Sequence, residues 1–160
     1  MAGDVRRIGN EKLMVRKAKV TDAPRVAELS AVLGYLVTRE IMEQRLERVL
    51  DLETHAVFVA ETPSNEVVGW THAAEQEILE AGCLCEIKGL VVAEGQRGCG
   101  VGRHLIEAVE RWAVARSLHE VIVRSNVVRI ESHPFYQRLS YQRIKTQHAY
   151  RKHLGSQDRS

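Results

Sequence analysis

The sequence predicts a mixed α/β domain built around a single sheet. Short runs rich in β-branched residues alternate with longer segments in which apolar residues recur at helical spacing. The length of 160 residues suits one well-buried domain. Neither an internal repeat nor a long linker divides the chain. Elements that alternate in this way pack as helices against a sheet.

The predicted domain covers residues 13–153. Residues 1–12 are polar and without pattern, so we expect a flexible leader there, and residues 154–160 are expected to form a polar tail. The apolar residues within 13–18 predict the first strand.

Two helices are predicted to follow the first strand. Residues 21–24, Thr-Asp-Ala-Pro, combine a hydroxyl cap, an acid in the first turn and a proline whose missing N–H costs nothing there. Apolar residues then recur at helical spacing until Gly34, which ends this helix. The second helix is expected to begin after Thr38 and to carry one apolar stripe.

Three strands are predicted next, at residues 56–60, 67–72 and 83–92. The first two form a hairpin around a turn at Pro63. The third contains Gly89 near its middle, and a glycine inside a strand indicates a bulge or a close approach to the backbone.

The C-terminal third is predicted to contain a strongly amphipathic helix at residues 101–116 and a strand at 121–123. A short helix at residues 134–139 and a final strand, in the extended, alternating segment from Tyr141, complete the order of elements.

The composition excludes several classes of partner. Lys and Arg number 23 and Asp and Glu number 21, which gives a net charge of +2, and aromatic residues make up 5%. Proteins that bind nucleic acid usually carry a strongly basic face, so nucleic acid is not expected as a partner. No segment approaches the roughly 18 apolar residues of a membrane span, and no signal peptide is evident. We therefore expect no membrane partner and a cytoplasmic location.

The three cysteines are Cys83, Cys85 and Cys99. An odd number, with two of them in an apolar run, is typical of reduced thiols. Because no second cysteine pair stands at zinc-like spacing, no metal is expected.

The most informative segment is 97–103, Arg-Gly-Cys-Gly-Val-Gly-Arg, which follows a strand and opens a helix. The first turn of a helix presents unpaired N–H groups and a partial positive charge. Glycines let an anion approach this backbone, and Arg97 and Arg103 can add charged hydrogen bonds. The segment therefore predicts a phosphate site; the alternative is a loop that only turns the chain.

Two common phosphate-binding motifs are excluded. Gly95 and Gly100 have the spacing of a P-loop, but Val101 and Gly102 stand where that motif has Lys and Ser or Thr. The dinucleotide motif fails because Arg103 occupies the position of its third glycine.

The pattern Arg97-x-x-Gly100-x-Gly102 resembles the acetyl-CoA signature of the GCN5-related N-acetyltransferase superfamily. Residues 134–141 resemble the later Phe-Tyr segment of that family, with Ser140 in place of its usual glycine. The order of elements matches as well, so the resemblance covers roughly residues 13–153. It implies a mostly antiparallel sheet of about six to seven strands with about four helices, splayed between the fourth and fifth strands.

The resemblance also implies acetyl-CoA as cosubstrate, with its pantetheine arm between the splayed strands and Gly89 as the bulge. Asn126, just after the fifth strand, resembles a family asparagine that contacts this arm, although its interval to Phe135 is longer than usual. The implied cofactor-binding residues are Leu90, Val91, Val92, Arg97, Gly98, Cys99, Gly100, Val101, Gly102, Arg103 and Asn126.

Two residues are candidates for catalysis. An amine with a pKa of about 10.4 must lose a proton before it attacks, and a carboxylate can accept that proton directly or through water. The resemblance implies Glu86 in this role and Tyr136 as the acid that protonates the departing thiolate. His72 is expected to be a satisfied strand histidine, with a place facing the acceptor pocket as the alternative. His133 is expected to be structural or on the cofactor side, with a catalytic role as the alternative.

The resemblance implies an N-acetyltransferase that transfers acetyl from acetyl-CoA to a primary amine of a small molecule or protein. Two alternatives are an acyl-CoA sensor without enzymatic activity on the same fold and an enzyme that uses nucleotides. Homodimers are common among similar proteins, so a homodimer is a further expectation.

Overall fold

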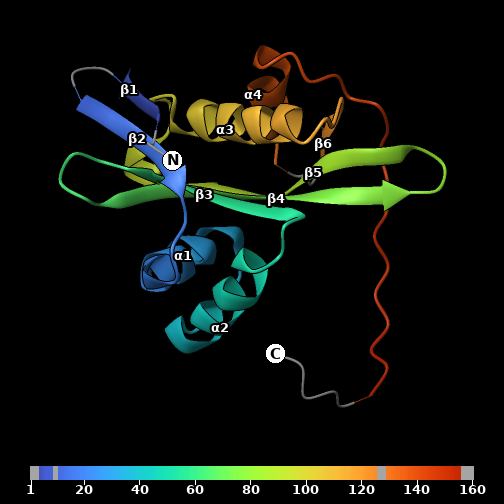
Figure 1. Cartoon of the computed structure of the whole chain (residues 1–160), viewed down its shortest axis with the longest axis horizontal. Helices are drawn as coiled ribbons and strands as arrows, with labels where there is room; N and C mark the ends of the chain where they lie inside the picture. The colour runs from blue at the N-terminus through green and yellow to red at the C-terminus, as the bar shows by residue number, and fades with distance from the viewer. Residues whose placement is uncertain (1–3, 9–10, 126–128, 156–160) are drawn as a thin grey trace. The chain divides into compact units, whose positions relative to one another are not determined.

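The computed structural model describes residues 4–8, 11–125 and 129–155 of the chain. The chain divides into two compact units, residues 1–123 and 124–160, and the predicted domain 13–153 includes parts of both. The first unit contains the sheet (Figure 1).

Six strands form one mixed sheet in the order β1-β2-β3-β4-β5-β6. Neighbouring strands from β1 to β5 are antiparallel, whereas β6 is parallel to β5. The strands are β1 (Asp4–Ile8), β2 (Glu11–Lys17), β3 (His55–Glu61), β4 (Val67–Ile78), β5 (Gly82–Val92) and β6 (Val121–Val123). The predicted mostly antiparallel sheet is thus confirmed.

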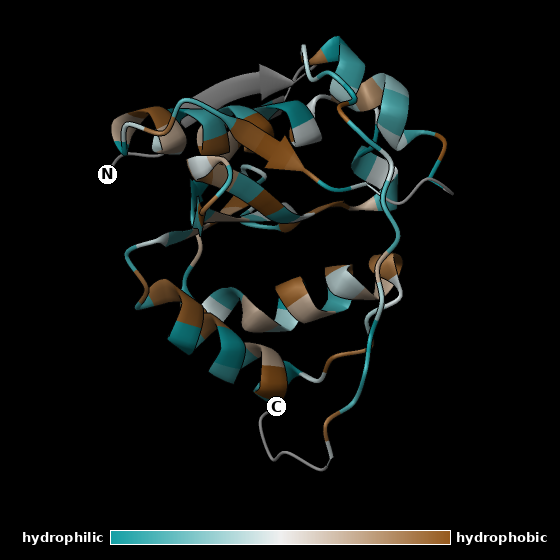
Figure 2. Cartoon of the chain, turned by 90° about the vertical axis from the view of Figure 1, so that its right-hand side faces the viewer, coloured by the Kyte–Doolittle hydropathy of each residue, from teal (hydrophilic) through white to brown (hydrophobic). Residues whose placement is uncertain are grey.

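The helices α1 (Ala23–Ser30) and α2 (Arg39–Leu50) lie on one face of the sheet, and α3 (Val101–Ala115) lies on the other (Figures 1 and 2). Both expected boundaries are confirmed: Gly34 has a φ of 84° where the first helical segment ends, and Thr38 Oγ1 accepts a hydrogen bond from the Ile41 amide. The first helical segment is not continuous, because short 3-10 turns precede and follow α1.

The sheet is buried on both faces at its centre, where β3 is buried from its second residue to its last. On the α3 side, Leu105 and Val109 are completely buried. Gly69 on β4 lets α3 pack closely, because a Cβ there would lie 2.9 Å from the Val91 carbonyl oxygen and 3.1 Å from the side chains of Leu105 and Val101. This contact fixes the first turn of α3 against the sheet.

A buried ion network joins the first strands to the start of α1. Arg16 donates to both carboxylate oxygens of Asp22 at 2.8 and 2.9 Å and to Glu61 Oε2 at 2.8 Å. Burial alone would raise the pKa of Asp22, but the hydrogen bonds from Arg16 and the Lys19 amide outweigh it and lower that pKa. Asp22 therefore serves this network as a buried ion.

Two sequence predictions of secondary structure are wrong. Asp4–Ile8 is not a flexible leader but pairs with β2, because backbone hydrogen bonds form a hairpin without any strong side-chain pattern. Conversely, residues 141–154 contain no strand: the alternating pattern is present, but these residues pair with no strand in the described part of the chain.

The second unit contains α4 (Ser132–Arg138) followed by an extended segment. Ser140 adopts a φ of 67° and its amide donates to the Gln137 carbonyl, which closes the helix. This left-handed conformation favours glycine. Across both units, none of the described helices combines the length and the apolar character needed to cross a membrane.

Candidate active site

A β-bulge interrupts the pairing of β4 and β5 in the middle of the sheet. His72 is opposite Gly89 and Ala73 is opposite Ile87, so Lys88 is an extra residue on β5. The predicted bulge at Gly89 is confirmed. A Cβ at Gly89 would lie 2.8 Å from the Trp70 ring, so the glycine makes room for this indole.

The bulge also marks the point where β6 stops pairing. β6 pairs with residues 85–87 of β5, and the last pair joins Ile87 and Val123. In the described part of the chain, residues 88–92 therefore have β4 on one side and no strand on the other. Such an edge presents free N–H and C=O groups to a ligand.

The open edge leads directly into the glycine-rich turn. Gly98 and Gly100 have φ values of 77° and 84°, and α3 then begins at Val101 without a side-chain cap from any described residue. A Cβ at Gly98 would meet no atom within 4 Å. The first amides of α3 thus face an uncrowded turn, which can receive an anion.

The side chains of this turn are accessible. Arg97, Cys99 and Arg103 are exposed. Arg103 lies 3.7 Å from Glu107, a loose surface pair that leaves its guanidinium able to reorient. The predicted cofactor-binding residues from 90 to 103 thus form one continuous segment of strand, turn and helix.

Glu86 is buried, with 5% of its surface exposed, and lies on β5 just before the bulge. Its Oε2 accepts a hydrogen bond from Lys88 Nζ at 3.0 Å. A buried carboxylate is stable only when it is paired, and the extra residue of the bulge supplies its partner.

Two histidines lie on the same face of the sheet as Glu86. His55 Nδ1 and His72 Nε2 are 2.9 Å apart, and their rings stack with centroids 5.2 Å apart. The sequence expectation of a structurally satisfied His72 is confirmed by this hydrogen bond. Sequence reasoning missed His55 and Lys88, since only the strand register shows which residues surround His72.

The predicted acid, Tyr136, lies on α4 in the second unit. Its ring contacts Phe135 and Tyr141 edge-on, with centroids 5.0 and 5.9 Å apart. Burial raises the pKa of Tyr136 from its ordinary value, while the charge of Arg129 opposes the shift. The phenol is therefore protonated near neutral pH and can donate a proton. Asn126 lies outside the described residues.

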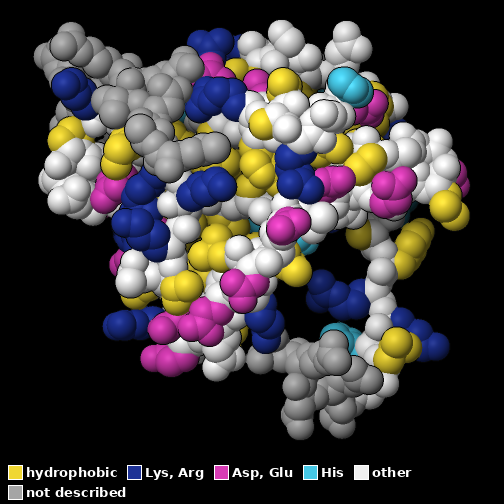
Figure 3. All heavy atoms as spheres, in the orientation of Figure 1, with side chains coloured by type: hydrophobic (Ala, Val, Ile, Leu, Met, Phe, Trp, Pro, Cys, Tyr) yellow, Lys and Arg dark blue, Asp and Glu magenta, His cyan; other side chains and the backbone are white. Residues whose placement is uncertain are grey.

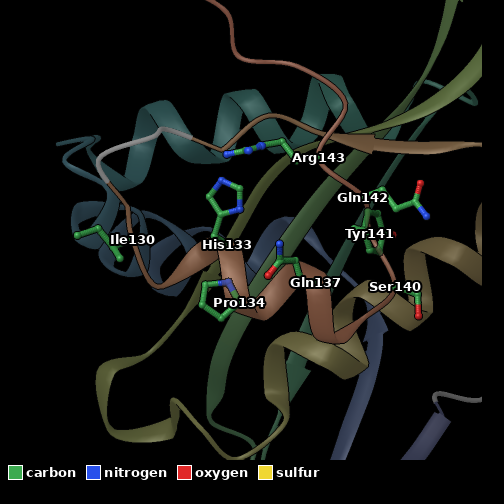
Figure 4. Close-up of a pocket in the computed structure, with 8 residues that line it drawn as sticks. All are labelled: Ile130, His133, Pro134, Gln137, Ser140, Tyr141, Gln142 and Arg143. Carbon is green, nitrogen blue, oxygen red and sulfur yellow. The ribbon is translucent and has the colours of Figure 1, made fainter.

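An open pocket of about 860 Å³ lies beside α4 (Figure 4). His133 and Gln137 project into it from the helix, and Arg143 reaches toward His133 from the segment that follows. The remaining lining residues are Ile130, Pro134, Ser140, Tyr141 and Gln142. His133 is thus placed in a pocket wall within the second unit.

Over α2, acidic and basic side chains lie next to one another on the face shown in Figure 3. Among the residues that the structure describes, no three His, Cys, Asp or Glu side chains gather as ligands of a metal ion would.

Known proteins share this architecture. The aminoglycoside N-acetyltransferase AAC(6')-Iy in complex with CoA superposes with a TM-score of 0.79 at 20% identity, over 89% of this chain and 95% of that chain. Glucosamine-6-phosphate N-acetyltransferase from Arabidopsis thaliana gives a TM-score of 0.75 at 20% identity, over 89% and 99%. At such identities the likeness shows the fold.

The sequence itself carries the assignment to a family. No curated protein matches this chain. Residues 26–141 match the profile of the acetyltransferase (GNAT) family, which is well over half of the chain. The chain therefore belongs to the GNAT acetyltransferase family.

Proposed function

We propose that this protein transfers an acetyl group from acetyl-CoA to a primary amine of a small molecule or a protein. The observation that carries the proposal is the continuity of the open β5 edge with the uncapped start of α3. One segment thus offers backbone groups for an extended amide-containing arm and, beyond them, amides for a diphosphate.

The residues present fit coenzyme A. Residues 90–92 would bond the pantetheine amides, and the turn at 97–103 would hold the diphosphate with its amides and the exposed Arg97 and Arg103. The similar AAC(6')-Iy binds CoA and a bisubstrate analogue made from CoA and an acetylneamine, which supports this assignment.

The acceptor amine must be neutral before it attacks. Deprotonating an amine of pKa about 10.4 near pH 7 costs roughly 4.6 kcal/mol. Glu86 is proposed to accept this proton, because it lies on the strand that carries the open edge and is shielded from water. Acetyl-CoA supplies the acetyl group as a thioester: the C–N bond forms as the C–S bond breaks.

Tyr136 is proposed to give its phenolic proton to the sulfur that leaves. A phenol holds its proton near pH 7, and a thiolate of comparable basicity can accept that proton as it leaves. In this proposal Glu86 accepts the proton that the amine loses, and Tyr136 donates the proton that the sulfur gains.

The activity is tested by the release of free thiol from acetyl-CoA across a panel of amines, with calorimetric binding of CoA alongside. The panel contains an aminoglycoside, glucosamine 6-phosphate, a polyamine and a peptide with a free N-terminus. We expect turnover with at least one class. Binding without turnover on any amine would replace the enzyme by an acyl-CoA sensor, and absence of binding would refute both.

Two glycines provide a matched test of the diphosphate site. Gly98 and Gly34 both have positive φ, and a Cβ at either meets nothing within 4 Å. Gly98→Leu and Gly34→Leu therefore carry a similar backbone cost of about 1–2 kcal/mol. Only Gly98→Leu is expected to weaken CoA binding, by about tenfold or more. Equal CoA affinity in both variants would refute the assigned site.

Two further expectations from the sequence stay predictions. The free thiols of Cys83, Cys85 and Cys99 favour a reducing compartment such as the cytoplasm. Homodimer formation is expected from the resemblance to the family, and analytical ultracentrifugation of the purified chain would measure it.

A further inference from the structure

The charges of the chain are divided unequally between its two units. Residues 124–160 contain eight Lys and Arg and two Asp and Glu, whereas residues 1–123 contain 15 Lys and Arg and 19 Asp and Glu. The positive charge of this nearly neutral chain is therefore concentrated in the second unit. A local excess of positive charge attracts anionic ligands.

Hydrogen-bond donors gather in the pocket beside α4, whose lining residues all belong to this unit. His133 and Gln137 stand about one turn apart on the helix, and Arg143 points toward His133 from the segment that follows (Figure 4). A guanidinium, a side-chain amide and an imidazole all carry N–H donors, the imidazole in either neutral tautomer. None of the eight lining residues is acidic, so the pocket itself provides no carboxylate for these donors.

Arg143 differs from the paired arginines of the first unit. There, Arg16 and Arg116 lie 2.8 and 2.6 Å from carboxylate oxygens. The side chain of Arg143 is exposed and, within the described part of the chain, forms neither an ion pair nor a hydrogen bond. Glu131, at the N-cap of α4, is the single acidic residue of the described range 129–155 and does not line the pocket. The guanidinium is thus available to an anion from outside the chain, which it can bind through two parallel N–H groups.

The rest of the pocket suits an organic molecule better than an inorganic ion. Ile130 and Pro134 add apolar surface next to the donors. The volume of about 860 Å³ lies in the range of small-molecule sites, which combine apolar walls with a few convergent polar groups. The occupant expected from this lining is a small molecule with an anionic end.

The pocket adjoins Tyr136, the proposed acid, within the same unit. His133 precedes Tyr136 by three residues on α4, and residues at this spacing are neighbours on a helix surface, with Cβ atoms about 5–6 Å apart. Tyr141 lines the pocket and its ring contacts that of Tyr136 edge-on, with centroids 5.9 Å apart. A small molecule whose anionic end lies in the pocket can therefore extend to the phenol.

We propose that this pocket binds the phosphate or carboxylate of the acceptor, so that the acceptor is a small primary amine that also carries an anionic group. This inference rests on the proposed function and deepens it, because it names the substrate class. Arg143 holds two oxygens of the anion, and His133 and Gln137 donate to it from α4. The amine end then extends toward Tyr136, where the thiolate leaves.

The test compares amines that differ in their anionic group: glucosamine 6-phosphate with glucosamine, and β-alanine with β-alaninamide. In at least one pair, free-thiol release should give a kcat/KM at least about tenfold higher for the anionic member. Arg143→Gln should abolish this preference and leave the neutral member and the melting temperature unchanged. Arg151→Gln removes an exposed arginine of the same segment outside the lining, and this control should keep the preference.

Coenzyme A is a second source of phosphate, and calorimetry with CoA and dephospho-CoA distinguishes it. Arg143→Gln should bind both as the unmodified protein does; weaker binding of CoA alone would assign the pocket to the cofactor and overturn the inference. Equal kcat/KM within both pairs, or a preference that survives Arg143→Gln, would also overturn it and leave the proposed function intact. Absence of turnover with every amine would overturn the proposed function and the inference together.

Discussion

Two polar clusters in the first unit differ in the charge of their side chains. In the first, the guanidinium of Arg16 donates to two buried carboxylates, those of Asp22 and Glu61, and the Lys19 amide adds a further hydrogen bond to Asp22. In the second, Glu86 pairs with Lys88 at the bulge of β5, and the hydrogen-bonded imidazoles of His55 and His72 lie on the same face of the sheet. The comparison teaches that paired buried charges stabilise the fold near neutral pH, whereas buried neutral imidazoles make its stability sensitive to acid.

The largest effect is expected from breaking the first cluster. Arg16→Met leaves Asp22 and Glu61 buried without their cation, which costs about 3–5 kcal/mol when one partner of a buried pair is removed. Urea unfolding should show this loss of the free energy of unfolding. CoA affinity of the folded fraction should be unchanged, and a loss below about 1 kcal/mol would show that the network does not stabilise the fold.

The second cluster should instead make stability depend on pH. Burial lowers the pKa of His72 from 6.5 to about 4, so below pH 6.5 the unfolded chain binds a proton that the folded chain refuses. Stability is full above pH 6.5 and is lost as the pH falls toward 4, by roughly 3 kcal/mol.

His72→Gln removes this titration. The difference in the free energy of unfolding between variant and unmodified protein should therefore shift in favour of the variant between pH 7 and pH 4. Parallel pH profiles, followed by urea unfolding at each pH, would contradict the assigned burial of His72.

The second unit contains Tyr136, which we propose as the acid that protonates the leaving thiolate. Tyr136→Phe keeps the ring contacts with Phe135 and Tyr141 but removes the phenolic proton. Turnover should fall by about tenfold, or 1.4 kcal/mol, while CoA affinity changes little. Unaltered steady-state kinetics would exclude Tyr136 as the acid.

The smallest effect is expected at Ser140, which closes α4 and for which we propose no role in catalysis. Its φ of 67° is costly for a residue with a Cβ, so Ser140→Gly should raise the free energy of unfolding by about 1 kcal/mol. Thermal unfolding measures the change, and kcat should not respond. A lower melting temperature would mean that the serine side chain stabilises this turn.

A structural feature could be predicted from the sequence where it depends on neighbouring residues, and not where it depends on residues far apart in the chain. Gly89 within a strand predicted the bulge, and Thr38 and Gly34 predicted helix ends, because each depends on neighbouring residues. The strand Asp4–Ile8 was missed because pairing with β2, not local pattern, creates it.

In the candidate site, too, features that depend on neighbouring residues could be predicted, and those that depend on strand pairing could not. The turn at 97–103 could be predicted because its chemistry is contiguous in sequence. The contact between His55 and His72 could not be predicted, because it depends on how β3 pairs with β4. Nor could the pairing of Glu86 with Lys88, because it depends on the one-residue shift in β5.

The most direct test of the central claim, that the start of α3 holds the diphosphate of coenzyme A, is alkylation of the cysteines with and without CoA. Cys99 is exposed within the turn, Cys83 is exposed far from it on the β4–β5 hairpin, and Cys85 is buried. We expect saturating CoA to protect Cys99 from iodoacetamide while Cys83 reacts at an unchanged rate, as read by mass spectrometry. Equal labelling of Cys99 with and without bound CoA would contradict the account.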